Sequence, residues 1–211
     1  SGIAYSKPAA RIMLADMALI RPQWMCGVPR LWEALAQGIY RSVRKDGRMF
    51  FAVFLFFIEV GKCFAWAKEH ISGRVCRYKN YPRFFDFFIG IVPFMLLLPL
   101  YTVGELIVYR RVRKLFGGRI TAAISGGGAL PPDVDAFYRA IGFKLLEGYG
   151  ITEAGPVLSV RDCIKPRSNC VGIVYPSAQI KIVSEKNGTV LSREPLGFGK
   201  KGLVFARGDQ I

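Results

Sequence analysis

Residues 120–153, ITAAISGGGALPPDVDAFYRAIGFKLLEGYGITE, contain the pattern that decides the fold of this 211-residue chain. The apolar run 120–124 predicts a strand, a helix begins at Pro132, and residues 143–146 predict a second strand. A glycine-rich turn, residues 125–128, connects the first strand to the helix. Strand, turn, helix and strand in this order predict a parallel α/β sheet with a site at the carboxyl ends of the strands.

Two motifs follow the predicted strands, and both suit a ligand that carries phosphate. Glycines 126–128 allow backbone N–H groups to approach a ligand closely. In Tyr149-Gly150-Ile151-Thr152-Glu153 the threonine hydroxyl can meet a phosphate, and the adjacent carboxylate can hold a magnesium ion. Glycine triplets are common at tight turns, so the inference depends on finding the two motifs together.

The segments on either side of this region extend the α/β pattern. Upstream, residues 1–48 predict a helix, a short buried strand at 24–28 and a second helix from Pro29. Ser6, followed closely by a proline, is expected to cap the first helix. Downstream, residues 119–211 are expected to hold the α/β part of the site and then the start of a β-rich subdomain, which contains a predicted hairpin turn, Asn-Gly.

Residues 49–118 form an insert that is aromatic and apolar, with basic flanks. Residues 49–66 are rich in Phe and predict a helix, and residues 68–83 predict a polar, basic loop or hinge. From Phe87 to Gly104 there are 18 residues without a charge, which is the lower bound for a membrane-spanning helix.

The sequence leaves three conformations open for residues 87–104. Two prolines inside the run interrupt helical hydrogen bonds, which favours a segment lying in a bilayer interface over a spanning helix. The basic flanks 74–83 and 110–114 would then face anionic headgroups. The third conformation is a helical hairpin buried against the domain. We expect peripheral membrane contact through residues 84–114, and hence a cytoplasmic location at the inner face of a membrane.

The charge balance narrows the classes of partner. The net charge is +15, and residues 41–119 hold 15 Lys and Arg against 5 Asp and Glu, so +10 of it lies there. A basic bias of this size suggests nucleic acid, an anionic membrane or an anionic small molecule. The aromatic residues of 50–66 are too densely clustered to act as separate stacking platforms for bases. We therefore expect no nucleic-acid partner.

Histidine and cysteine usage argues against two kinds of catalytic site. His70 is the only histidine and has no ligand-like surroundings, so a Ser-His-Asp or Cys-His mechanism is not expected. The five cysteines are odd in number and contain no Cys-x-x-Cys pair, so neither a disulfide framework nor a zinc site is indicated. A reducing, cytosolic setting fits this usage.

Four motifs, in order along the chain, resemble those of adenylate-forming, AMP-binding enzymes, and more narrowly the long-chain fatty-acid–CoA ligases (acyl-CoA synthetases). Beside the two motifs above, residues 27–33 (GVPRLWE) are similar to a Val-Pro-Arg-x-Trp-Glu element, and residues 170–176 (CVGIVYP) to Val-Gly-x-x-x-Pro. The resemblance implies a central fragment of the large N-terminal domain of such a ligase. The phosphate loop, the hinge and the C-terminal lid would lie outside the fragment, which is therefore expected to be inactive alone.

The resemblance also implies a role for each motif residue. The residues implied to bind ATP or AMP are Gly126, Gly127, Gly128, Ala129, Gly148, Tyr149, Gly150 and Thr152. The glycine turn would line the adenine side of the pocket and the route of the acyl chain, and Tyr149 would pack against adenine. Thr152 and Glu153 are the implied catalytic residues: Thr152 would contact the phosphate, and Glu153 would coordinate magnesium.

The implied reaction converts a long-chain fatty acid, ATP and CoA into acyl-CoA, AMP and pyrophosphate through an acyl-adenylate. The substrate carboxylate attacks the α-phosphate, so the chemistry needs charge stabilisation and no side-chain nucleophile. Two alternatives remain open. One is an adenylate-forming ligase for another carboxylic acid, and the other is a non-catalytic, membrane-bound module with the same fold.

Overall fold

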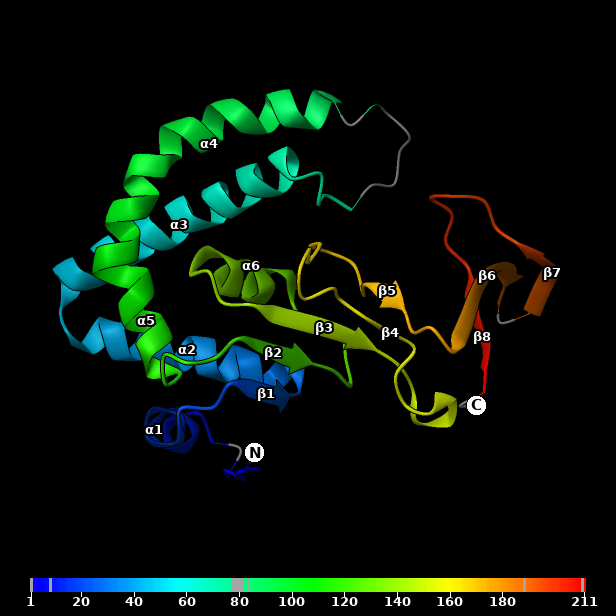
Figure 1. The fold of residues 1–211 in the computed structure, drawn as a ribbon, viewed down its shortest axis with the longest axis horizontal. Helices are drawn as coiled ribbons and strands as arrows, with labels where there is room; N and C mark the ends of the chain where they lie inside the picture. The colour runs from blue at the N-terminus through cyan, green and yellow to red at the C-terminus, as the bar shows by residue number, and fades with distance from the viewer. Residues whose placement is uncertain (1, 8, 77–81, 83, 188, 210) are drawn as a thin grey trace.

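The computed structural model describes residues 2–7, 9–76, 82, 84–187, 189–209 and 211 (Figure 1). Its main sheet has five strands in the order β1-β2-β3-β4-β5. These strands are β1 (Trp24–Gly27), β2 (Ala122–Ser125), β3 (Leu145–Tyr149), β4 (Ser159–Val160) and β5 (Ile173–Val174). β1, β2 and β3 are parallel, whereas β4 and β5 are antiparallel to their neighbours. The prediction of an α/β fold with a parallel sheet is confirmed.

Two predictions at the N-terminal end are wrong in detail. β1 forms one edge of the sheet, and Trp24 is 53% exposed, so this strand is not buried. The first helix, α1 (Ala10–Ile20), has no side-chain cap. The Ser6 hydroxyl donates instead to Asp16 Oδ2 at 2.6 Å, which holds the preceding segment against the side of the helix.

The hydrophobic core lies where the parallel strands meet α2 (Pro29–Lys45) and α6 (Pro132–Ala140). Trp32 of α2 is fully buried and makes an edge contact with the ring of Tyr138 on α6, 5.7 Å away. The Tyr138 hydroxyl donates to the Trp32 carbonyl at 2.9 Å. α2 begins at Pro29 as predicted, because its fixed φ suits the first helical turn.

The predicted insert forms a helical hairpin that covers the outer side of α6. It consists of α3 (Arg48–Ile71) and α4 (Phe84–Gly104), and the second arm continues through the π-helical turn η1 (Glu105–Tyr109) into α5 (Arg110–Leu115). Figure 1 shows α4 arching along α3, with α3 between α4 and α6. The predicted loop 68–83 is wrong at its start, because α3 continues to Ile71. Residues 77–81 and 83 lie outside the described residues.

The two arms of the hairpin are held close by glycine. A Cβ added at Gly90 of α4 would lie 2.7 Å from the Ala67 carbonyl oxygen of α3. A Cβ at Gly61 of α3 would lie equally close to the Ala140 carbonyl oxygen of α6. Both helix pairs therefore approach to a distance that only a residue without a side chain allows.

The outer face of α4 is exposed. Pro93 and Pro99 both lie inside the helix, and the helix continues through them. It curves, as Figure 1 shows, because a proline inside a helix bends it. The buried-hairpin alternative is therefore right about the pairing with α3 and wrong about burial. Two helical runs, Phe84–Leu115 and Arg48–Ile71, are long and apolar enough to cross a membrane. Of the most apolar 18-residue stretch in each, 11% is buried in the first run and 33% in the second. Length and composition are weak evidence for a span, because helices in the core of soluble proteins meet the same test.

A second, antiparallel sheet follows and confirms the predicted β-rich segment. Its order is β7-β6-β8, with β6 (Ala178–Lys186), β7 (Thr189–Pro195) and β8 (Leu203–Gly208). Asn187 has φ +52°, which suits the predicted hairpin turn, while Gly188 lies outside the described residues.

Candidate functional site

Three of the four motifs meet at the carboxyl edge of the parallel strands. Ser125, the last residue of β2, pairs with Gly27 of β1 on one side and with Glu147 of β3 on the other. The Gly126 N–H donates to the Gly27 carbonyl at 3.2 Å. A Cβ added at Gly126 would lie 3.9 Å from the Gly148 carbonyl oxygen. Segments up to about 100 residues apart in sequence are therefore in contact and form one rim.

The glycine turn leaves open space beside its backbone. Gly127 has φ +79°, a conformation that favours glycine. Gly126 and Gly128 do not have positive φ, and a Cβ at either would meet nothing nearer than 3.7 Å. Packing within the protein therefore does not require glycine at these two positions. Glycine at these positions leaves the backbone of the turn accessible.

The Tyr-Gly-x-Thr-Glu segment turns sharply at the end of β3. Thr152 and Glu153 are exposed on the short 3₁₀ turn η2 (Thr152–Ala154). Gly150 is required by the fold, because a Cβ there would lie 1.8 Å from the Pro156 carbonyl oxygen. The chain then returns along β3, since Leu158 N–H donates to the Tyr149 carbonyl at 2.9 Å. Tyr149 itself is 37% exposed at this rim.

The fourth motif lies one strand further along the sheet. Its residues Ile173 and Val174 form β5, which pairs with β4, and Tyr175 N–H donates to the Leu158 carbonyl at 2.8 Å. Gly172 has φ +91° and would place a Cβ 2.0 Å from the Val160 carbonyl oxygen. This glycine therefore serves the packing of β5 on β4.

A buried ion network that no sequence motif predicts supports the rim. Glu147 accepts the Leu130 N–H at 3.1 Å and an Arg161 Nη2–H at 2.9 Å. Arg161, whose side chain is 2% exposed, also donates to Asp135 Oδ1 at 2.8 Å. The glycine turn, β3 and α6 are thus tied to one guanidinium. The only signal in the sequence is an acidic residue, Glu147, within an apolar strand.

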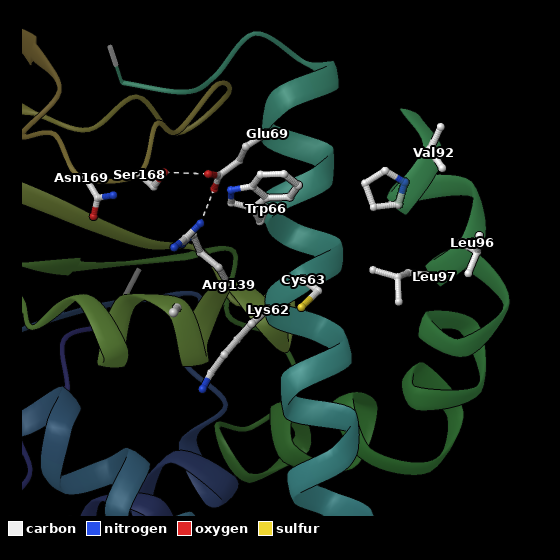
Figure 2. Close-up of a pocket in the computed structure, with 12 residues that line it drawn as sticks. Lys62, Cys63, Trp66, Glu69, Val92, Leu96, Leu97, Arg139, Ser168 and Asn169 are labelled. Atoms are coloured by element: carbon white, nitrogen blue, oxygen red, sulfur yellow. Dashed lines mark hydrogen bonds and ion pairs between the residues drawn. The ribbon is translucent and has the colours of Figure 1, made fainter. Parts of the chain in front are cut away.

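The network continues from α6 to the hairpin. Arg139 of α6 pairs with Asp135 at 3.3 Å and with Glu69 of α3 at 2.5 Å. Glu69 also accepts the Ser168 hydroxyl at 2.7 Å, as Figure 2 shows. A cavity of about 730 Å³ lies beside these residues, between α3, α4, α6 and the loop that carries Ser168.

The rim carries polar groups that could meet a nucleotide and one magnesium ion. The hydroxyls of Ser125 and Ser159 are buried and have no hydrogen-bond partner among the described residues, so polar groups are available under the glycine turn and β4. Within the same described residues there is no group of three His, Cys, Asp or Glu side chains that could hold a metal alone. Magnesium is typically held by one or two carboxylates together with substrate phosphates, and the exposed Glu153 suits that arrangement.

Comparison with known proteins agrees with this fold. The family model described as AMP-binding enzyme matches residues 3–211. The chain is 34% identical over 222 residues to the probable acyl-activating enzyme 16, chloroplastic, of Arabidopsis thaliana. It is 30% identical over 217 residues to the long-chain-fatty-acid–[acyl-carrier-protein] ligase AEE15, chloroplastic, of the same plant. Each comparison covers 100% of this chain and 29% of the relative, so the chain spans less than a third of their length.

A solved structure shares the fold. The crystal structure of the anthranilate CoA ligase AuaEII in complex with anthranoyl-AMP superposes with a TM-score of 0.50 at 13% sequence identity. The superposition covers 96% of this chain and 25% of that chain. At this identity the likeness shows the fold alone.

Proposed function

The chain belongs to the AMP-binding enzymes, and from this premise we propose that it is the central part of a ligase that activates a long-chain fatty acid through an acyl-adenylate. The observation that carries the proposal is the rim, where the Val-Pro-Arg, glycine-turn and Tyr-Gly-x-Thr-Glu segments meet beside open space. Residues 1–48 and 119–211 would supply the ligase domain, and residues 49–118 an insert with a separate task.

The proposed roles follow from what each group presents at the rim. Backbone N–H groups of the turn 126–129 approach the nucleotide and the acyl group, and Tyr149 packs against adenine. The Thr152 hydroxyl donates to a phosphate oxygen as charge builds during attack of the substrate carboxylate on the α-phosphate. Glu153 holds magnesium, which supplies charge neutralisation on the phosphates when bound. The products of this step are the acyl-adenylate and pyrophosphate.

Arg161 and Glu147 are proposed to hold the rim in shape. Glu147 fixes the Leu130 N–H at the end of the glycine turn, and Arg161 fixes Glu147. Neither side chain needs to touch the substrate. Placement of donors to within a fraction of an ångström depends on supporting contacts of this kind.

A long-chain acid with CoA as acceptor is the proposed substrate pair. The Val-Pro-Arg-x-Trp-Glu element and the apolar hairpin favour a lipid substrate. The name of one relative, AEE15, specifies long-chain fatty acids with acyl-carrier protein as the acceptor. Acyl-carrier protein is therefore the alternative acceptor, and other carboxylic acids are the alternative substrates.

Contact with a membrane surface through the insert is a second proposed function. Apolar side chains stand exposed along α4 and η1, among them Leu96 and Leu106, each 70% exposed. Arg110, Arg111 and Lys114 follow on the exposed side of the same helical run. An apolar face that ends in cations is suited to an anionic bilayer interface.

The test of the proposed reaction is ATP–pyrophosphate exchange by the full-length parent protein, with magnesium and either palmitate or oleate. We expect exchange that depends on the fatty acid and is lost in Glu153→Ala, with circular dichroism showing an intact fold. Product analysis after adding CoA or acyl-carrier protein separates the acceptors. Exchange only with another carboxylate would move the substrate class. A folded protein without exchange for any acid would favour a non-catalytic module.

A further inference from the structure

The cavity between the hairpin and α6 is separate from the rim, since none of the residues proposed to bind the nucleotide lines it. Figure 2 shows Cys63, Trp66 and Glu69 on α3, with labelled side chains of α4 on one side. Arg139 of α6 and Ser168 lie on the other side. Its volume of about 730 Å³ is within the range of small-molecule sites.

One side of the cavity is apolar and open to solvent. α4 contributes Val92, Leu96 and Leu97, of which Val92 is 63% and Leu96 70% exposed. Trp66 of α3 is 45% exposed in the same cavity. Removing apolar surface from water is favourable in proportion to the area covered, so an alkyl chain placed here would be stabilised by that contact.

The other side of the cavity is polar and already ordered. Glu69 bridges Arg139 at 2.5 Å and Ser168 at 2.7 Å, which fixes the loop against α3. Lys62 uses one of its three N–H donors on Glu59, at 2.7 Å. The Glu59 side chain is 67% exposed and lies three residues from Lys62 on the same helix, so the pair offers little resistance to a competing carboxylate.

We propose that this cavity binds a long-chain fatty acid, with its alkyl chain against Val92, Leu96 and Leu97 and its carboxylate at Lys62. An apolar side opposite Lys62, a lysine that lines the cavity, matches a single-chain anionic amphiphile. The inference rests on the proposed long-chain acid as substrate class, and it names a docking site for that acid on the insert, apart from the reaction site.

The test is protection of Cys63, an exposed thiol that lines the cavity, against a maleimide reagent. Oleate is added to the full-length protein at a concentration below the critical micelle concentration of oleate, without ATP. By mass action, oleate at ten times its Kd should slow labelling of Cys63 about tenfold. Leu96→Glu should abolish the protection. Leu106→Glu changes a leucine of equal exposure that does not line the cavity, and protection should remain.

Four results would overturn the proposal: no protection in the unmodified chain, protection that survives Leu96→Glu, equal loss in both variants, or equal protection by oleyl alcohol and oleate. The last result would show that the carboxylate is not recognised. Circular dichroism of both variants shows that they fold. Because the labelling uses no ATP, its outcome is independent of pyrophosphate exchange. Protection without exchange would leave the cavity site and reject the proposed reaction.

Discussion

Arg161 shows what a single residue contributes that no motif predicts. Its guanidinium lies between Asp135 and Glu147 with almost no exposure. The motif residues could be proposed from the sequence because their chemistry is local: glycine at a turn, and threonine beside glutamate at a strand end. The role of Arg161 arises only when β3, β4 and α6 come together, and the residues around it in sequence give no sign of it.

We predict that Arg161→Met lowers the free energy of unfolding of the chain by about 3 kcal/mol, because it leaves the Glu147 carboxylate without its cation and Asp135 with the Arg139 pair alone. Urea denaturation followed by circular dichroism measures the change. Lys165→Met, an exposed change in the same loop, should stay within about 0.5 kcal/mol. A similar small change for Arg161→Met would show that the network does not support the rim.

The buried residue Tyr138 leads to a prediction about how the free energy of unfolding depends on pH. Burial raises the pKa of Tyr138 well above that of a free phenol. A raised pKa in the folded state means that the stabilising contribution is complete below the unfolded value, about 10, and is lost as pH rises above it. The free energy of unfolding should therefore fall from about pH 10 upward.

Tyr138→Phe should make this fall shallower, because the variant has no phenol to ionise at that position. It should also cost about 1 kcal/mol at neutral pH, since the hydrogen bond to the Trp32 carbonyl is lost. Tyr40, whose pKa burial also raises, keeps part of the pH dependence. Tyr175→Phe changes an exposed tyrosine and serves as the control. An unaltered alkaline slope in Tyr138→Phe would contradict the assignment.

At the scale of helices and strands, the sequence predicts what local periodicity controls. The strand–turn–helix–strand order of residues 120–153 is confirmed, because apolar spacing, a starting proline and glycine turns act within a few residues. The burial of β1 was predicted wrongly, since a short apolar run does not reveal which strand lies at a sheet edge. The Ser6 cap was wrong because a competing carboxylate, Asp16, lies within reach of its hydroxyl.

Helix contacts set opposite expectations for two glycines that lie inside helices. Gly38 of α2 has room for a Cβ, which would lie 3.8 Å from the nearest atom, Ala10 Cβ. Gly38→Ala should therefore raise the free energy of unfolding by up to about 1 kcal/mol, through helix propensity. Gly90→Ala should lower it by about 1–3 kcal/mol, because a Cβ 2.7 Å from the Ala67 carbonyl forces α4 away from α3.

Urea denaturation of the two alanine variants tests this pair under identical conditions. If both glycines responded with the same sign, the close approach of α3 and α4 would not be the reason for Gly90. Thiol labelling of Cys63 adds a local measure, since separation of the two helices should expose it further.

At the scale of the whole molecule, the two proposed tasks occupy different faces. The rim lies at the carboxyl edge of β1, β2 and β3, whereas the hairpin lies on the outer side of α6 (Figure 1). The ion network from Glu147 through Arg161, Asp135 and Arg139 to Glu69 connects them. A lipid bound in the hairpin cavity would therefore lie beside the same ion network that positions the glycine turn.

Membrane contact is a prediction about this whole face. The chain should co-sediment with vesicles that contain anionic lipid, and raising the salt should weaken binding, since the screening length falls from about 10 Å at 0.1 M to 3 Å at 1 M.

Leu106→Glu should weaken binding about tenfold or more, because burying a leucine contributes about 1.5–3 kcal/mol and each 1.4 kcal/mol is a factor of ten. Leu191→Glu, at a similarly exposed leucine on β7, should bind as the unmodified chain does. Equal binding to neutral and anionic vesicles would show that Arg110, Arg111 and Lys114 do not contribute to membrane binding. Equal loss in both variants would mean that binding is general apolar adsorption, and the curved, exposed face of α4 would then need another partner.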